Sequence, residues 1–362
     1  MAMTAARLVL VLVVSVALAA AGCATAPPAP TAAPAPEPPR VAAPSLPAPA
    51  PAAPAPAPEP LPERFESDDF IVVFAREGDT ASTLAARVLG DESRAWMIED
   101  YNGRAAFSRG QQVVVPKGDW NPSGVDTNGY QIVPVLVYHN LGPESKGRLV
   151  LGARAFEQQM RHLKAEGYRV ISLRDFVDFM EQGRQIPRRS VIVTFDDGYR
   201  SFKDIAYPIL KELGFTATLF VYTDYVGAGR NALTWAELGQ FAKEGFEIQA
   251  HTKTHGDLRR ESGEPDAQYN RRMKAELSDP QALFRRHLGR PADILAFPYG
   301  RWDEDLLKKV TEYGYIAAFT VRRQGNPSFV YPLRGHRAQV YSEMSLEDFA
   351  RNLAVYQQED LR

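Results

Sequence analysis

A short apolar run ends in two adjacent aspartates, and this stretch constrains the fold more than any other. Residues 191–195 are Val, Ile, Val, Thr and Phe, and Asp196, Asp197 and Gly198 follow at once. A run of this length and composition, bounded by a turn signal, predicts a buried strand with both carboxylates at its end. Buried like charges are costly, and a bound cation would remove that cost. The alternative is an ordinary solvated Asp-Gly turn.

Two histidines follow a second apolar run. Residues 246–250 predict a strand, and His251 and His255 come directly after it. Residues four apart share one face if the segment is helical. Imidazole suits zinc and its first-row neighbours, and two histidines with one carboxylate leave a coordination position open for water. The pattern therefore indicates a metal site assembled from two strand ends.

A third apolar run, residues 294–297, ends in the turn Pro298-Tyr299-Gly300, which can present a backbone N–H and an aromatic ring to a ligand. Taken in order, TFDDG, HTKTH and FPYG resemble the polysaccharide deacetylase family (NodB-like, carbohydrate esterase family four) over residues 130–355. The resemblance implies a metal-dependent N-deacetylase that removes acetyl groups from an N-acetylhexosamine polymer. The polymer is either peptidoglycan or a poly-N-acetylglucosamine exopolysaccharide.

The resemblance also implies a role for each site residue. Asp197, His251 and His255 would bind a divalent metal, for which zinc is the expected ion. Asp196 would act as general base, because its neighbour is tied to the cation while it stays free to take a proton. The backbone N–H of Tyr299 would donate a hydrogen bond to the oxyanion.

One position departs from the family pattern. Many members carry an arginine two residues before Pro-Tyr-Gly to orient the base, and here that residue is Ala296. Arg334 and Arg337 are both candidates to replace it. The pair Tyr138-His139, at the end of an early strand, resembles the branch that acts on extracellular poly-N-acetylglucosamine.

The departing amine must gain a proton, so a general acid is needed near the metal. Histidine is the side chain best suited to this near neutral pH. His139 is the leading candidate because its strand should end at the same barrel mouth as Asp196. His336 is the alternative, whereas His162 and His287 are expected at the surface.

Strand-like runs alternate with helical patterns from residue 130 to residue 355, which predicts an α/β fold with a parallel sheet. The expected strands are residues 133–138, 169–173, 190–195, 217–222, 246–250, 294–297, 315–319 and 338–341. The clearest expected helices are residues 156–167, 173–183, 204–214 and 235–245. The family resemblance implies a distorted, incomplete (β/α) barrel, with the three motifs at the C-terminal ends of strands.

Residues 1–23 predict export and lipidation. Arg7 precedes an apolar stretch, residues 8–21, whose length is typical of a signal peptide, since a membrane span takes roughly twenty residues. The segment ends in Ala-Ala-Gly-Cys23, which resembles a bacterial lipobox, and Cys23 is the only cysteine. With Ala24 next, the resemblance implies the periplasmic side of the outer membrane, or the cell surface. The alternative is an ordinary signal peptide with an incidental cysteine.

Residues 24–62 are almost entirely proline and alanine, which predicts an extended polyproline-like tether without a core. At about 3.1 Å per residue it would reach at most roughly 120 Å.

Residues 63–120 resemble a LysM module, a small βααβ unit whose family binds N-acetylglucosamine-containing chains such as peptidoglycan. The matching residues are Gly78, Asp79, Thr80, Asn102, Gly110 and Pro116. The helical part is longer than usual, and the alternative is a degenerate module that only packs on its neighbour.

Three functions remain open at this level. The leading one is the metal-dependent polysaccharide N-deacetylase, and the module and tether favour a polymer over a small amide, which a deacylase or deiminase would use. The alternative from another class is a cell-wall-binding lipoprotein with an inactive deacetylase fold. Tyr299, with Trp235 or Trp302, is a candidate surface for stacking on a sugar, although packing is the alternative for both tryptophans. A net charge of −2 gives no reason to expect nucleic-acid binding.

Overall fold

A computed structural model describes residues 64–362 of the chain. The predicted signal peptide, Cys23 and the predicted tether lie outside the described residues. Within residues 64–362, no helix is long and apolar enough to cross a membrane.

The first described unit is a small α/β module. Its strands and helical segments are β1 (Phe65–Glu66), β2 (Phe70–Phe74), α1 (Ala81–Leu84), η1 (Ala85–Leu89), η2 (Glu92–Arg94), α2 (Ala95–Asn102) and β3 (Gln112–Pro116). The predicted order of strand, two helices and strand is present, with β1 added to make an antiparallel sheet in the order β1-β2-β3. Asn102 joins helix to sheet, because its amide donates to Val114 O (2.7 Å) and accepts from Val114 N (3.1 Å). The likeness to LysM stays a prediction.

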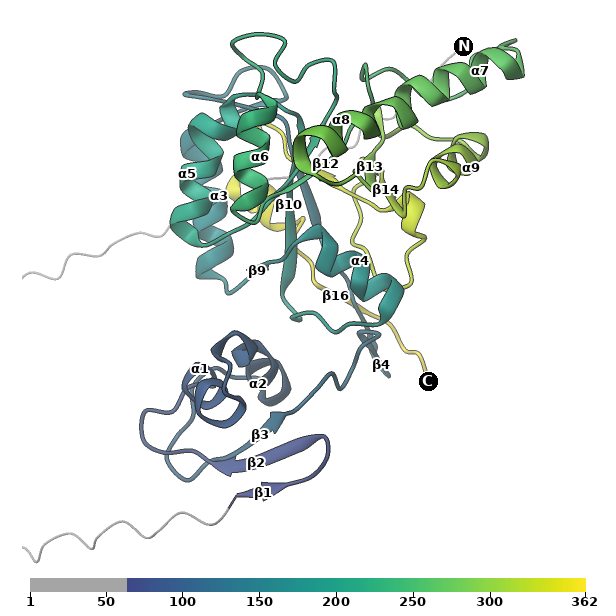
Figure 1. Cartoon of the computed structure of the whole chain (residues 1–362). Helices are drawn as coiled ribbons and strands as arrows, with labels where there is room; N and C mark the ends of the chain where they lie inside the picture. The colour runs from purple at the N-terminus through teal and green to yellow at the C-terminus, as the bar shows by residue number, and fades with distance from the viewer. Residues whose placement is uncertain (1–63) are drawn as a thin grey trace, which may run out of the picture. The chain divides into compact units, whose positions relative to one another are not determined.

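The larger unit is built on a parallel sheet, as predicted (Figure 1). Its strands are β6 (Val135–Tyr138), β9 (Arg169–Val170), β10 (Ser190–Asp197), β11 (Thr218–Val221), β12 (Glu247–Ala250), β13 (Ile294–Ala296), β14 (Ala317–Phe319) and β15 (Ala338–Gln339). The order across the sheet is β14-β13-β12-β11-β10-β6-β15, with β9 also paired to β10, and every ladder is parallel. Small two- and three-stranded sheets use β4 (Val125–Asp126), β5 (Gly129–Gln131), β7 (Asn140–Gly142), β8 (Val150–Gly152) and β16 (Tyr356–Gln358).

The sheet curls until its two edges approach each other at Gly335. Gly335 N donates to Ala318 O at 2.9 Å, and Thr320 N donates to Gly335 O at 2.8 Å. Gly335 lies just before β15, so the segment that leads into one edge strand also bonds to the end of the other. A distorted, incomplete barrel results, in which residues 332–339 bring the two edges together.

Helices alternate with the strands along the chain and cover the sheet (Figure 1). They are α3 (Ala153–Ala165), α4 (Leu173–Gln182), α5 (Tyr207–Leu213), α6 (Trp235–Lys243), α7 (Asp266–Met273), α8 (Asp279–Leu288), α9 (Glu304–Glu312) and α10 (Leu346–Ala350), with the shorter η3 (Phe202–Ala206), η4 (Lys274–Ser278), η5 (Pro298–Gly300) and η6 (Pro332–Arg334). The four predicted helices are present. Ser172 and Thr234 form capping boxes at the starts of α4 and α6, which satisfies backbone N–H groups that have no partner within the helix.

The strands bury both faces, and their residues alternate between two cores. In β10, Val191, Val193 and Phe195 pack in the outer core against the helices, whereas Ile192 packs in the barrel interior. Because side chains of a strand alternate between faces, Asp196 follows Ile192 into the interior. The strand period therefore places this carboxylate inside the barrel mouth.

Candidate active site

Backbone strain is concentrated at the three motifs. Among residues 64–362, the non-glycine residues with left-handed φ are Asp197 (75°), Thr252 (74°), His255 (62°) and Tyr299 (59°). Such conformations cost on the order of 1–3 kcal/mol each and persist only where the surrounding structure imposes them. All four belong to TFDDG, HTKTH or FPYG, so the strain marks one site built from three strand ends.

The left-handed turn at Asp197 redirects its carboxylate. By strand alternation Asp197 would share the outer face with Val193 and Phe195. The break in alternation instead brings its Oδ1 to 3.6 Å from His251 Nε2 and 3.4 Å from His255 Nε2. These three candidate ligand atoms all lie within 4.8 Å of one another.

The His251–His255 segment is not helical. A different backbone conformation brings the two histidines together. Thr252 is left-handed, and its hydroxyl accepts a hydrogen bond from His255 N at 3.0 Å. This turn brings the two imidazole rings to a centroid separation of 4.7 Å. The predicted pairing of the histidines is thus reached through a tight turn.

The His251 ring has the charge state and tautomer of a neutral candidate ligand. Its Nδ1 lies 2.8 Å from Ala296 O, an acceptor that requires the proton on Nδ1 and leaves the lone pair on Nε2. The ring is fully buried, and burial lowers its pKa to about 4, so it is uncharged at neutral pH. Burial also lowers the pKa of His255. Neutral imidazoles are the form that binds a metal.

Asp197 fits a cation at this position. Its Oδ1 is a buried oxygen that has no hydrogen-bond partner within the described part of the chain, although it lies between two imidazoles. Burial, with the neighbouring charge of Asp196, raises the pKa of Asp197 to about 6, because neither favours a negative charge on this carboxyl group. Ligand atoms about 2.0–2.2 Å from a tetrahedral zinc ion lie roughly 3.3–3.5 Å apart, close to the separations observed. The donor set therefore suits zinc or a neighbouring divalent metal.

Of the two candidate arginines, Arg337 is the one that contacts Asp196. The Arg337 Nη1 and Nη2 donate to Asp196 Oδ1 at 2.6 Å and Oδ2 at 2.8 Å, and Arg337 Nε donates to Thr320 O at 3.1 Å. Burial acts to raise the pKa of Asp196, but the charge and hydrogen bonds of Arg337, together with His251 and His139, outweigh it and lower the pKa to about 2. The carboxylate is therefore ionised and fixed in orientation. Ala296 is small and fully buried in the barrel interior that Arg337 enters.

The two candidate general acids lie in different places. Tyr138 pairs with Phe195 across the parallel β6–β10 ladder, so His139 and Asp196 come next at the same end of neighbouring strands. Burial has the largest effect on the pKa values of Asp196 and Asp197, and His139 acts against it in both. His139 Nδ1 is buried without a hydrogen-bond partner within residues 64–362. His336 instead lines a neighbouring pocket, with its Nδ1 3.4 Å from Gly325 O.

Aromatic rings flank the second histidine. The His255 ring lies 4.9 Å from Tyr299, which is 57% exposed, and 5.4 Å from Tyr222 (centroid separations). Trp235 stacks on His287 at 4.9 Å and packs on α8, which agrees with the packing alternative for this tryptophan. No pattern in the sequence singled out Tyr222, which directly follows β11.

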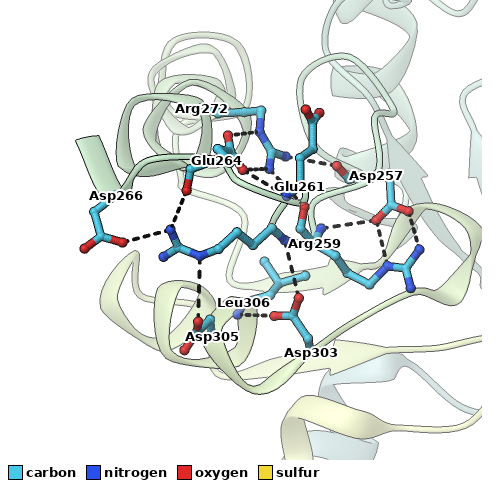
Figure 2. Close-up of polar contacts among 10 residues, drawn as sticks. Asp257, Arg259, Glu261, Glu264, Asp266, Arg272, Asp303, Asp305 and Leu306 are labelled. Carbon is cyan, nitrogen blue, oxygen red and sulfur yellow. Dashed lines mark hydrogen bonds and ion pairs between the residues drawn. The ribbon is translucent and has the colours of Figure 1, made fainter. Parts of the chain in front are cut away.

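Ion pairs brace the loop that follows His255 (Figure 2). The Arg272 side chain donates to both oxygens of Glu264, at 2.9 and 2.6 Å, and to the Asp257 carbonyl at 3.0 Å. The hydrogen bond from Arg272 lowers the pKa of Glu264 to about 2. Asp257 also accepts from Arg301 at 3.0 Å, which joins this loop to the Tyr299 turn. The loop carrying one candidate ligand is therefore tied to the turn carrying the candidate oxyanion donor.

Comparison with known proteins connects this site to one family. Residues 183–318 match the family model described as polysaccharide deacetylase. The YxkH protein of Bacillus subtilis (strain 168), provisionally assigned to the polysaccharide deacetylases, is 28% identical over 238 residues, which are 64% of this chain and 80% of that protein. The poly-beta-1,6-N-acetyl-D-glucosamine N-deacetylase of Staphylococcus epidermidis is 25% identical over 175 residues, which are 47% of this chain and 60% of that protein.

The fold is also found among solved structures. The Streptococcus pyogenes deacetylase PplD, solved in complex with acetate, superposes with a TM-score of 0.56 and 24% sequence identity. The match covers 62% of this chain and 99% of that one. At this identity the likeness supports the predicted barrel and goes no further.

Proposed function

The chain carries a polysaccharide deacetylase domain, and from this premise we propose that it is a metal-dependent hydrolase of the N-acetyl groups of an N-acetylhexosamine polymer. The single observation that carries the proposal is the convergence of the four strained residues of the three motifs around one buried set of two imidazoles and two carboxylates. An inactive member would have no need to maintain this strain, which favours an enzyme over a binding protein with a silent site.

The contacts of each site residue support a separate catalytic role for it. Asp197, His251 and His255 would hold a divalent cation, which would lower the pKa of a water molecule and polarise a carbonyl. Asp196, ionised and oriented by Arg337, takes a proton from the attacking water. The Tyr299 N–H donates to the oxygen on which negative charge develops.

Collapse of the tetrahedral intermediate breaks the C–N bond and releases acetate. The departing amine must take up a proton, and His139, which follows the strand next to that of the two aspartates, supplies it. The proposed base, Asp196, and the proposed acid, His139, are thus separate groups at the same end of the barrel, and their environments differ. Arg337 keeps Asp196 ionised, whereas His139 has a buried nitrogen without a partner among the described residues.

The native metal is zinc in this proposal, because two imidazoles and one carboxylate are a typical zinc donor set with an open position. The substrate is a polymer that contains N-acetylglucosamine. The similarity to the staphylococcal enzyme supports this substrate class, and the chain spans 60% of that protein's length.

We further infer that the remaining segments bring the enzyme to its polymer. The module at residues 63–120 binds peptidoglycan, and Cys23 carries a lipid that holds the protein at the periplasmic side of the outer membrane, or at the cell surface. The strand–helix–helix–strand order of the module supports the first role. The apolar stretch before a single cysteine supports the second.

Free-amine release tests the catalytic proposal. Purified full-length protein is incubated with peptidoglycan and with poly-N-acetylglucosamine, before and after removal of metal by a chelator. We expect amine and acetate in equal amounts from at least one polymer, loss of both with chelator, and recovery when zinc is restored. An Asp196→Asn variant that retains metal serves as the matched control. Absence of amine release from both polymers with bound metal would favour the inactive, cell-wall-binding alternative.

A further inference from the structure

A pocket beside the candidate active site is lined by residues that adjoin or contact two residues of that site. Its volume is about 430 Å³, and its lining includes Gly300, Trp302, Arg322, Tyr331, Arg334 and His336. Gly300 directly follows Tyr299, whose ring lies against His255. Thr320, also in the lining, accepts a hydrogen bond from Arg337, the arginine that holds Asp196. The pocket therefore adjoins the Tyr299 turn of the candidate active site.

The pocket carries uncompensated positive charge. Neither Arg322 nor Arg334 has a carboxylate partner among residues 64–362, in contrast to Arg337 in the adjacent site. Burial lowers the pKa of His336, and the charges of both arginines lower it further, so this ring adds no charge at neutral pH. Two guanidinium groups thus face one pocket without an anion.

Aromatic rings hold one of these guanidinium groups. The Arg334 guanidinium carbon lies 5.0 Å from the centroid of the Trp302 ring and 4.8 Å from that of Tyr331. Trp302 is partly buried against the outer core, whereas Tyr331 is 48% exposed. Flat rings with a polar edge suit the apolar faces of a sugar, and a stacked guanidinium is preorganised to bind a carboxylate through two parallel hydrogen bonds.

We propose that the Arg322–Arg334 pocket binds a carboxylate-bearing sugar residue of the substrate polymer, next to the N-acetylhexosamine that is deacetylated. The inference rests on the function proposed for the adjacent site and narrows its substrate class. In a cell-wall glycan strand, alternate N-acetylhexosamines carry an ether-linked lactic acid, and its carboxylate is free on strands from which the peptide stem has been removed. Poly-N-acetylglucosamine has no carboxylate, and its deacetylation creates ammonium groups that two unpaired guanidinium groups repel.

Matched oligosaccharides test the pocket without turnover. One is an alternating glycan tetrasaccharide with free lactyl carboxylates, and the other is its methyl ester. Dissociation constants are measured by calorimetry with metal-stripped full-length protein, in which the pocket residues are intact. The acid should bind about tenfold more tightly than the ester, the effect of one charge-assisted hydrogen bond. Raising the ionic strength should reduce the difference, because salt screens partly exposed charges.

Three variants separate this pocket from general charge effects. Arg322→Gln and Arg334→Gln should each reduce the preference for the acid several-fold and leave the ester's dissociation constant unchanged. Arg322 is exposed, so its replacement does not disturb packing. Arg154→Gln removes the same charge from an exposed position of α3 and should preserve the full preference. Equal binding of acid and ester by the unmodified protein, or a preference that survives Arg322→Gln/Arg334→Gln, would overturn the proposal.

Turnover distinguishes failure of this inference from failure of the proposed function. With zinc-loaded protein, Arg334→Gln should raise KM for the acid several-fold more than KM for the neutral ester, whereas Arg154→Gln should leave the activity on both unchanged. Release of amine from both oligosaccharides without a preference for the acid would refute the pocket and retain the deacetylase. A preference in binding without amine release from either one would retain the pocket and refute the deacetylase.

Discussion

Replacing Arg337 by methionine tests how Asp196, the proposed base, is positioned. Arg337 is fully buried, and its guanidinium makes both hydrogen bonds to Asp196 and one to Thr320 O. Methionine has a similar length and removes the charge and all three donors. Asp196 is then left buried with no cation paired to it. Removal of one partner of a buried ion pair costs about 3–5 kcal/mol, a large part of a typical domain stability of about 5–15 kcal/mol.

The same change should reduce kcat more than it changes KM. Asp196 loses the two bonds that fix its orientation, and a misplacement of about 1 Å at a catalytic group costs roughly 10²-fold in rate. Since Arg337 touches the base and none of the candidate metal ligands, metal content should remain at the level of the unmodified protein. A loss of kcat at constant KM and constant metal content is the signature of a positioning residue.

A double variant separates stability from positioning. Asp196→Leu/Arg337→Met replaces both charges by apolar side chains, so no buried charge is left uncompensated and its free energy of unfolding should exceed that of Arg337→Met. Urea denaturation measures both, with Arg154→Met as the control for loss of an exposed arginine. Turnover close to normal in folded, metal-bound Arg337→Met would refute the assignment. So would a double variant that is less stable than the single one.

Four further outcomes are expected. His251→Ala/His255→Ala should contain no bound divalent metal by elemental analysis, and metal content equal to that of the unmodified protein would contradict the ligand assignment. His139→Ala should lose about 10²–10⁴-fold in kcat with metal retained, and near-normal turnover would exclude His139 as the acid. Glu264→Gln should be less stable than the unmodified protein at pH 7. Because the pKa of Glu264 is lowered to about 2 in the folded protein, its contribution to stability is present above the unfolded pKa of about 4.3 and is lost as the pH falls toward 2. The urea midpoints of the two proteins should therefore converge in acid, and a constant difference would contradict this. Cys23→Ser should move the exported protein from the membrane to the soluble fraction, and the lipidation hypothesis fails if the unmodified protein is already soluble.

Much of the site could be predicted because its residues follow strands. Short β-branched runs identify buried strands, and parallel strands in a barrel bring their C-terminal ends to one edge. The acidic strand end and the histidine pair could therefore be grouped from the sequence, and the family resemblance singled out Asp197 as the ligand. The structure places the candidate ligand atoms of Asp197, His251 and His255 within 4.8 Å of one another. The predicted strands and helices of the larger unit were also found, because local composition and period determine them.

The conformations that complete the site could not be predicted from local patterns. The pairing of His251 with His255 depends on a left-handed residue at Thr252, a β-branched type that rarely adopts this conformation unaided. Surrounding contacts impose it, so no propensity of the segment itself signals the turn. The same holds for Tyr299, whose left-handed backbone brings its ring against His255.

The sequence by itself determined the strands, the three motifs at their ends and the residue types suited to a metal. It did not distinguish Arg334 from Arg337, which are three residues apart and chemically identical. Only the curled sheet decided between them, because its edges meet near Gly335 and direct Arg337 into the barrel interior, where it pairs with a carboxylate 141 residues away in the chain. Arg334 remains outside, over Trp302 and Tyr331. The physical reason is that periodicity reports which face of a strand a residue occupies, whereas a pairing between distant residues depends on how the whole sheet closes.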